Sequence, residues 1–415
     1  MKSVYYRPIV TQADELFNFD TMNEHIPFLD LASTSFSTKS SQVHAARDDF
    51  WCARTPFGIA VLRHNHVGRL LRDKRLRQGS HAWPDTQGLE GSFAEFWKRS
   101  IISKEGDSHR DLRNLAVPAL SPEFISGMKP AFDGAAEKLA DQLSRQRTCE
   151  FMEDFSIPFA GLANCILLNV ADERWEQISH DASDLGLAMG VKAKEFEPIF
   201  NAACDRLMGL ADELIERAKS GEDKSGYVAR LLKNFNEIGT LDHQALKDMI
   251  VISIFGGVDT TRSQLGFAIA LFIKHPSEWQ KLRADLSLVD NAVQEIIRAW
   301  PTTTWASREA VCDFEFEGVA FERGTTLHML VHSSARDPAI CDEPKFNISK
   351  QRKIHFGFGG GAHHCIGHLM ARTDMASALV ALAKRFSGFE FDGEPEYLPD
   401  SGNTSPVKLP IKLHI

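Results

Sequence analysis

The chain has 415 residues, 43% of them hydrophobic, which is enough apolar material for one large core or for two or three average domains. Its formal net charge of −9 argues against a general nucleic-acid-binding protein, because such proteins present a strongly basic surface. Residues 1–20 contain neither an apolar run of the ~20 residues that a membrane span needs nor the regions of a secretory signal.

No linker, low-complexity tract or internal repeat divides the sequence, so we expect a single domain over residues 1–415. The seven cysteines are odd in number and form no Cys-x-x-Cys pair, which fits a reducing compartment better than a disulfide framework. We therefore expect a cytoplasmic protein with no membrane anchor and no nucleic-acid partner.

The first quarter of the chain predicts short strands, a basic helix and a long irregular stretch. Apolar residues flank a Pro56-Phe57-Gly58 turn, which predicts strands within 50–62. A helical period with a basic run follows over 64–76, and most such runs are solvated helix faces. Residues 78–106 are polar and aromatic without a clear period, and a long irregular stretch in a compact domain is usually functional or mobile.

His109 and Arg113 are four residues apart in the next segment, so on a helix their side chains point the same way. Such a pair can hold one carboxylate through charge-assisted hydrogen bonds, although the pattern alone favours an exposed pair of cations. Residues 128–219 then have the pattern of amphipathic helices with short connections and contain no chemical motif.

A helix capped by Thr240 or Asp242 is predicted to continue without interruption to Lys274, where His275-Pro276 ends it. At ~1.5 Å per residue this helix spans roughly 50 Å, the width of the whole molecule. Residues 249–255 are apolar on almost every face, so we expect the helix to pass through the centre of the fold.

A weak point interrupts this strong helix at Gly256-Gly257-Val258-Asp259-Thr260-Thr261. Each glycine costs ~1 kcal/mol relative to alanine in a helix, and Thr260 is prone to side-chain hydrogen bonds that bend helices. Such a point predicts a kink or bulge, which is often found at a functional site. A purely structural kink is the alternative.

Glu295 and Arg298 place opposite charges three residues apart in a helix that ends at Pro301. Such a pair contributes only tenths of a kcal/mol where it is exposed. Alternating apolar residues over 314–321 then predict short strands.

The most informative stretch is His355-Phe-Gly-Phe-Gly-Gly-Gly-Ala-His-His-Cys-Ile-Gly367, in which five glycines surround Cys365 ahead of a predicted helix. Glycine allows the close approach of a flat partner. Backbone N–H groups at a helix start stabilise a thiolate, which is a good metal ligand. A turn with an inert buried cysteine is the alternative.

These motifs, in this order, resemble the soluble bacterial form of the cytochrome P-450 family from about residue 50 to the C-terminus. The positions that match the family's cysteine loop are Phe358, Gly359, Gly361, His363, Cys365 and Gly367. The resemblance implies a mainly α fold with small β-sheets and one long central helix that crosses over the haem. It also implies a b-type haem (iron protoporphyrin IX) with Cys365 as the proximal iron ligand.

The same resemblance implies roles for the other motifs. Asp259 and Thr260 would be the acid–alcohol pair beside bound O₂. The expected partners of the haem propionates are His109, Arg113 and Arg308. The residues expected to line the substrate pocket are Phe96, Trp97, Ile252, Phe255, Gly256, Thr304 and Trp305.

Glu295 and Arg298 would form a buried structural pair, which in the family has an arginine as a third partner. Lys350 stands at the register of that arginine, and Arg352 follows two residues later. Lysine cannot reproduce the guanidinium fork, so the third partner is left open by the sequence.

The function implied is monooxygenation of a lipophilic small molecule, terpenoid or polyketide-like, with O₂ as co-substrate. The chain has no flavin or iron–sulfur cysteine motif, so a separate ferredoxin would supply the electrons. A peroxide-driven peroxygenase would typically lack the acid–alcohol pair, and a reductase or isomerase on the same scaffold would not need it. A haem sensor would need an output domain, and the sequence predicts none.

Overall fold

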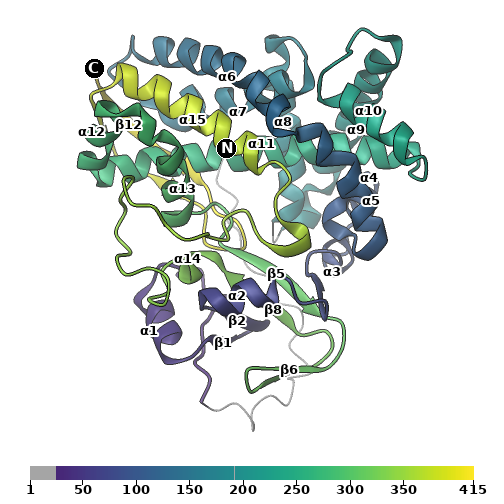
Figure 1. The fold of residues 1–415 in the computed structure, drawn as a ribbon, viewed down its shortest axis with the longest axis vertical. Helices are drawn as coiled ribbons and strands as arrows, with labels where there is room; N and C mark the ends of the chain where they lie inside the picture. Colours follow the sequence, from purple (N-terminus) through teal and green to yellow (C-terminus); the bar gives the residue numbers. More distant parts are fainter. Residues whose placement is uncertain (1–24, 191) are drawn as a thin grey trace.

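Helices form most of the structure, and the strands are gathered in small sheets, as a computed structural model that describes residues 25–190 and 192–415 shows (Figure 1). The expected fold class, mainly α with small β-sheets, is confirmed. Residues 1–20, where we expect no membrane span and no secretory signal, lie outside the described residues. Among the helices of the described part, none is long and apolar enough to cross a bilayer.

The longer helices are distributed along the whole chain. They are α1 (Ser41–Asp49), α4 (Ser92–Arg99), α5 (Gly106–Ala116), α6 (Pro122–Leu143), α7 (Ile157–Leu168), α8 (Trp175–Gly186), α9 (Glu197–Ser220), α10 (Tyr227–Ile238), α11 (His243–Lys274), α12 (Pro276–Ala284), α13 (Val289–Ala299) and α15 (His368–Arg385). The short helices are α2 (His64–Leu70), α3 (Trp83–Thr86) and α14 (Val331–Ser334). Single turns are η1 (Ile101–Ser103), η2 (Pro118–Leu120), η3 (Met152–Ser156), η4 (Asp172–Arg174), η5 (Leu187–Met189), η6 (Ala193–Phe196), η7 (Leu286–Leu288) and η8 (Gly361–His363).

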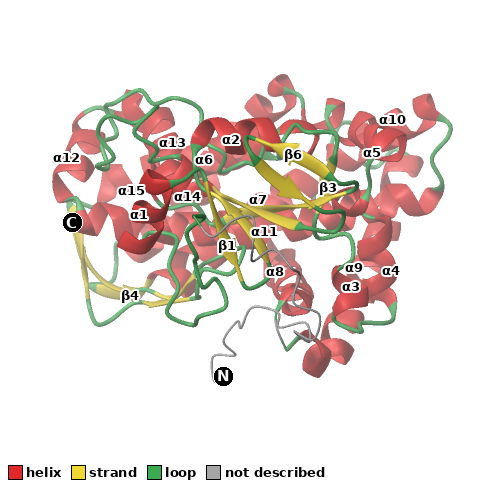
Figure 2. Ribbon diagram, turned by 90° about the horizontal axis from the view of Figure 1, so that it is seen from below, coloured by secondary structure: helices red, strands yellow, loops and turns green. Residues whose placement is uncertain are grey.

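The largest sheet has five strands in the order β1-β2-β8-β5-β3. Its strands are β1 (Cys52–Thr55), β2 (Gly58–Val61), β3 (Leu76–Gln78), β5 (Trp305–Ala310) and β8 (Thr326–Leu330). Only the β2–β8 pair is parallel within this sheet. Figure 1 places the sheet below the helical part, and Figure 2 shows it from that side.

The remaining strands form three smaller sheets. They are β4 (Thr148–Glu150), β12 (Pro410–His414) and β9 (Gly388–Phe391) in one, β6 (Phe314–Phe316) with β7 (Val319–Phe321), and β10 (Glu396–Tyr397) with β11 (Pro406–Lys408). The β1–β2 turn expected at 56–58 is present, with Gly58 at a φ of +134°. A Cβ on Gly58 would lie 2.1 Å from the Thr326 carbonyl oxygen, so β2 needs glycine here to pair with β8.

Helix α11 is the central element of the fold. The Asp242 side chain, rather than Thr240, caps it by accepting a hydrogen bond of 2.8 Å from the Ala245 N–H. Its 32 residues correspond to about 48 Å. Its N-terminal half is buried in one hydrophobic cluster with α4, α5 and α7–α10, and its C-terminal half in a second cluster with α6, α7, α12, α13 and α15. The expectation of a long helix through the centre is thus correct.

Two expected segments differ from the structure. The helix expected over 64–76 ends at Leu70, and β3 follows it because the chain turns to pair with β5. The stretch 78–106 is not irregular throughout: it contains α3, α4 and η1. Phe93, Phe96 and Trp97 lie on one face of α4 and are buried, so tertiary packing stabilises this short helix.

Candidate functional site

One cavity of about 1380 Å³ lies between α11, the five-stranded sheet and the Cys365 loop, and α3, α5 and α15 complete its wall. Ligand pockets are typically ~300–1,000 Å³, so this cavity has room for a large cofactor and a substrate together. The expected site residues that line it are Trp97, His109, Arg113, Ile252, Gly256, Thr260, Trp305, Arg308, Phe358, Gly359, His363, Cys365 and Gly367.

The Cys365 thiol lies in the wall of this cavity, at the end of a loop fixed by its backbone. The Cys365 N–H donates to the Phe358 carbonyl at 2.9 Å. Gly361, at a φ of +68°, lies against α2, where a Cβ would be 2.2 Å from the Leu71 carbonyl oxygen. Burial raises the pKa of the Cys365 thiol, although the Gly367 N–H and the charge of Arg113 oppose this. This direction is opposite to the expected preference for thiolate.

Arg308 and Arg113 are the two guanidinium groups expected at the haem that lie in the cavity wall, which also includes Arg54. Arg308 is 4% exposed, and it donates to the Gln78 amide oxygen and to the Ser307 carbonyl, each at 2.9 Å. Burial lowers the pKa of Arg308 to about 10. Arg113 donates to the His364 carbonyl at 2.9 Å. Within the described residues neither group forms an ion pair with a carboxylate, so both are available to an acidic ligand.

His109 lies beside His363 from the cysteine loop, with the two ring centroids 4.1 Å apart. Burial, and then the neighbouring His363, lower the pKa of His109 to about 4, so its ring is neutral near pH 7. His363 Nε2 lies 2.9 Å from a carboxylate oxygen of Glu105, which also accepts the Gln78 N–H at 2.6 Å. Gln78 and Glu105 were not expected here. The β3–β5 pairing and the start of α5 bring them to Arg308 and His363, and no sequence motif marks them.

Thr260 and Asp259 point in different directions from α11. Thr260 lines the cavity, and its hydroxyl donates to the Gly256 carbonyl at 2.7 Å. Asp259 does not line the cavity and forms an ion pair with Arg262. The helix is α-helical through this stretch, so the expected bulge is absent between His243 and Lys274. The Thr260 bond to a carbonyl one turn back is of the kind that bends helices, and the expected kink stays a prediction.

The expected substrate-pocket set divides in two. Trp97, Ile252, Gly256 and Trp305 line the cavity, whereas Phe96, Phe255 and Thr304 do not.

The three residues that do not line the cavity lie elsewhere for different reasons. Phe96 is 0% exposed, because it packs against Phe93 in the hydrophobic core, and only its neighbour Trp97 reaches the cavity. Phe255 points toward α8, where a Cβ on Gly186 would lie 3.7 Å from its ring. Thr304 precedes Trp305 at the start of β5, and successive strand residues point to opposite faces.

Ser253 is a cavity residue that the sequence analysis missed. It lies seven residues before Thr260, and therefore on the same face of α11. A helical projection from Gly256 and Thr260 would have found it.

Glu295 is the centre of a buried ion-pair network behind the cysteine loop. Arg298 donates to its two carboxylate oxygens at 2.6 and 2.8 Å, and Arg352 donates to the same two oxygens at 3.2 Å each. Lys350 pairs instead with Asp342. Arg352 is therefore the third partner that the sequence left open.

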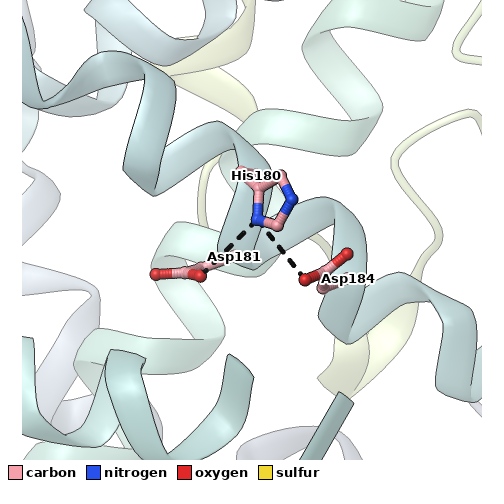
Figure 3. Close-up of side chains that lie close together, drawn as sticks. All are labelled: His180, Asp181 and Asp184. Carbon is pink, nitrogen blue, oxygen red and sulfur yellow. Dashed lines mark ion pairs between the residues drawn. The ribbon is translucent and has the colours of Figure 1, made fainter. Parts of the chain in front are cut away.

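One group of possible metal ligands lies apart from the cavity, on α8. His180 Nδ1 lies 3.9 Å from an Asp181 oxygen and 3.4 Å from an Asp184 oxygen (Figure 3). Arg206 contacts the same two carboxylates at 2.7 and 3.4 Å. A cation would have to displace this guanidinium, so we interpret the group as a surface ion-pair network.

Comparison with known proteins agrees with this geometry. The family model described as "Cytochrome P450" matches residues 179–412. Luteothin monooxygenase of Streptomyces thioluteus is 32% identical over 396 residues, which cover 94% of this chain and 96% of that protein. The crystal structure of CalO2 is similar with a TM-score of 0.83 at 24% identity, covering 92% of this chain and 99% of that one. The crystal structure of P450BioI in complex with hexadec-9Z-enoic acid ligated acyl carrier protein is similar with a TM-score of 0.80 at 22% identity. The match covers 90% of this chain and 97% of that one.

Proposed function

Since this chain belongs to the bacterial cytochrome P450 family of haem-iron monooxygenases, we propose that it inserts one oxygen atom from O₂ into a lipophilic small molecule, terpenoid or polyketide-like. The observation that carries the proposal is that Cys365, Thr260 and the cations of α5 and β5 all line one cavity. The second oxygen atom leaves as water.

We assign the cofactor as haem b, with Cys365 as its iron ligand and Phe358, Gly359 and Gly367 shaping the loop against it. Bound through a thiolate, haem iron supplies O₂ activation, because the sulfur donates electron density that favours O–O cleavage. His109, Arg113, Arg308 and His363 would hold the propionates. The fit is supported by Arg308, a buried guanidinium whose hydrogen-bond acceptors are all neutral.

Thr260 and Asp259 carry the proposed proton delivery. Thr260 lines the cavity, and its hydroxyl can exchange its bond to the Gly256 carbonyl for one to a water molecule. Asp259 would pass protons to that hydroxyl from the outer side of α11. This arrangement favours a monooxygenase over a peroxide-driven peroxygenase, a reductase or an isomerase, none of which needs two protons at this position.

The substrate would bind among Trp97, Ile252, Gly256 and Trp305, a wall that favours an apolar molecule. A relative of this fold binds a fatty acyl chain on a carrier protein, which is compatible with a long lipophilic substrate. Glu295 and Arg298 would hold the cysteine loop in place and take no part in the chemistry.

Electrons would come from a separate ferredoxin-type protein, and the chain would act as one domain in the cytoplasm. Arg72 and Lys74 support a docking face beside the cysteine loop. Both are exposed, and Arg72 follows Leu71, which contacts Gly361 of that loop.

The test is incorporation of labelled oxygen by the haem-loaded protein. A ferredoxin and its reductase supply electrons under ¹⁸O₂ to a panel of terpenoids and polyketides that first shift the haem spectrum. We expect one labelled oxygen atom per product molecule, and none when ¹⁸O is supplied only as water. Product formation from hydrogen peroxide alone, at a rate equal to that with the ferredoxin, would favour the peroxygenase instead.

A further inference from the structure

A pair of hydroxyl groups, of Ser253 on α11 and Tyr227 on α10, lies at the wall of the cavity. The Ser253 Oγ lies 2.7 Å from the hydroxyl of Tyr227, the first residue of α10, and 2.7 Å from the Met249 carbonyl. Tyr227 is 0% exposed and lies in the hydrophobic cluster around the N-terminal half of α11. Phenylalanine outnumbers tyrosine 28 to 4 in this chain, so a phenolic hydroxyl is an uncommon choice for a core position.

The directions of these hydrogen bonds follow from what each group can donate. Ser253 donates to the Met249 carbonyl. The Tyr227 proton must therefore go to the Ser253 oxygen, because within the described residues the phenol has no other acceptor. Burial raises the pKa of Tyr227 to about 12, so the phenol keeps that proton near neutral pH.

The Ser253 hydroxyl is the group of this pair that can donate a hydrogen bond to a ligand. Met249 already accepts the regular helical N–H of Ser253, so losing the hydroxyl leaves its carbonyl satisfied. Tyr227 would continue to donate to Ser253, and hydrogen bonds in such a chain strengthen one another. Ser253 lines the cavity on the same face of α11 as Gly256 and Thr260.

We infer that Ser253 is a specificity-determining residue that donates a hydrogen bond to a carbonyl oxygen of the substrate, and that Tyr227 is the positioning residue behind it. This inference rests on the proposed function and narrows its substrate class. The substrate is a lipophilic ketone, ester or lactone rather than a hydrocarbon. Such a carbonyl is a feature of polyketide-like molecules more than of simple terpenes.

The test measures ligand affinity rather than turnover, by optical titration of the haem-loaded protein with 2-undecanone, 2-undecanol and n-undecane. One net hydrogen bond in a protein corresponds to a change of about 3- to 10-fold in the dissociation constant. We expect Ser253→Ala to raise the dissociation constant of the ketone by about that factor and to change that of the alkane less than twofold. Tyr227→Phe should raise the dissociation constant of the ketone about 2- to 3-fold, because it leaves the serine in place but removes the hydrogen bond that the phenol donates to it.

Ser263 provides a matched control on the same helix. Its hydroxyl also donates to a carbonyl one turn back, that of Asp259 at 2.7 Å, but it does not line the cavity. Ser263→Ala should leave the affinities for all three probes unchanged. Equal losses for ketone and alkane in Ser253→Ala would show a packing effect and overturn the inference. A loss of affinity for the alcohol alone would show that Ser253 accepts a hydrogen bond from the ligand instead of donating one, which also overturns the inference.

The failure of this inference differs from the failure of the proposed function. The reduced carbon monoxide spectrum of the same samples reports thiolate ligation. A protein with that signature but without a preference for the ketone keeps the monooxygenase assignment and loses only the role of Ser253.

Discussion

Asp259 forms an ion pair with Arg262, with its Oδ1 atom 2.5 Å from Nη2 and 3.0 Å from Nε of the guanidinium. The next residue, Thr260, faces the cavity. The two members of the proposed acid–alcohol pair are therefore separated in the described state. A proton can pass from Asp259 to Thr260 only after the carboxylate leaves Arg262 or through intervening water.

Thr260→Ala should retain haem and ligand binding but divert electrons to hydrogen peroxide, since the hydroxyl that delivers protons is lost. Asp259→Asn should lower kcat by ~10²–10⁴-fold with little change in ligand affinity, as expected for loss of a general acid. The measurements are product and peroxide per NADH consumed. An unchanged product yield in Thr260→Ala would remove the proposed role.

Cys365→His should still bind haem but lose the optical signature of thiolate ligation in the reduced carbon monoxide complex. The side chain lies in the cavity wall, and histidine also binds iron. Cys341→Ser, a change at a buried cysteine outside the cavity, is the control and should keep the signature. Survival of the signature in Cys365→His would mean that another cysteine is the ligand.

Arg352→Ala should lower the free energy of unfolding by about 3 kcal/mol, because it removes one of the two guanidiniums that neutralise and hydrogen-bond the buried Glu295. Chemical denaturation of the haem-loaded protein measures this. Lys350→Ala removes a cation two residues away that pairs only with surface carboxylates, and should leave the denaturation midpoint unchanged. Equal effects of the two changes would argue against the network.

Asp374, on α15, should make stability fall as pH rises. It is 1% exposed, and burial raises its pKa well above the ordinary value. The native state therefore keeps the proton that the unfolded state loses above about pH 4, so the free energy of unfolding falls by about 1.4 kcal/mol per pH unit up to the native pKa. Asp374→Asn should remove this slope, which denaturation series between about pH 5 and pH 8 would detect. Parallel curves for the two proteins would show that Asp374 is ionised in the native state.

Arg72→Glu should slow reduction by an acidic ferredoxin, and the wild-type rate should fall as salt rises, because surface charge steers association. Arg75→Glu is the matched comparison. The Arg75 guanidinium pairs with Asp73 at 2.6 Å and lies over the Phe314 ring, so its charge is largely neutralised. Stopped-flow reduction measures both rates. A salt-insensitive rate with both variants equal to wild type would place the donor on another face.

The resemblance to the family's motifs predicted which residues meet at the cavity. Cys365, His109 and Arg308 were named from it and line one cavity although they are far apart in the chain. Side-chain direction was less predictable. Phe255 is adjacent to Gly256, but one residue is roughly 100° around a helix, and it points to α8 instead. Arg352 could not be chosen over Lys350 because the path of the 346–352 loop depends on tertiary contacts.

The spacing of Ser253 and Thr260 along α11 has a consequence for regiochemistry. Seven residues of α-helix separate them by about 10.5 Å, and the helix between them is unbroken, so this length is fixed. A substrate held by its carbonyl at Ser253 would present to the oxygen-binding end a carbon determined by its distance from that carbonyl. The position of oxidation would then be counted from the carbonyl group and would stay the same when the far end of the molecule is lengthened.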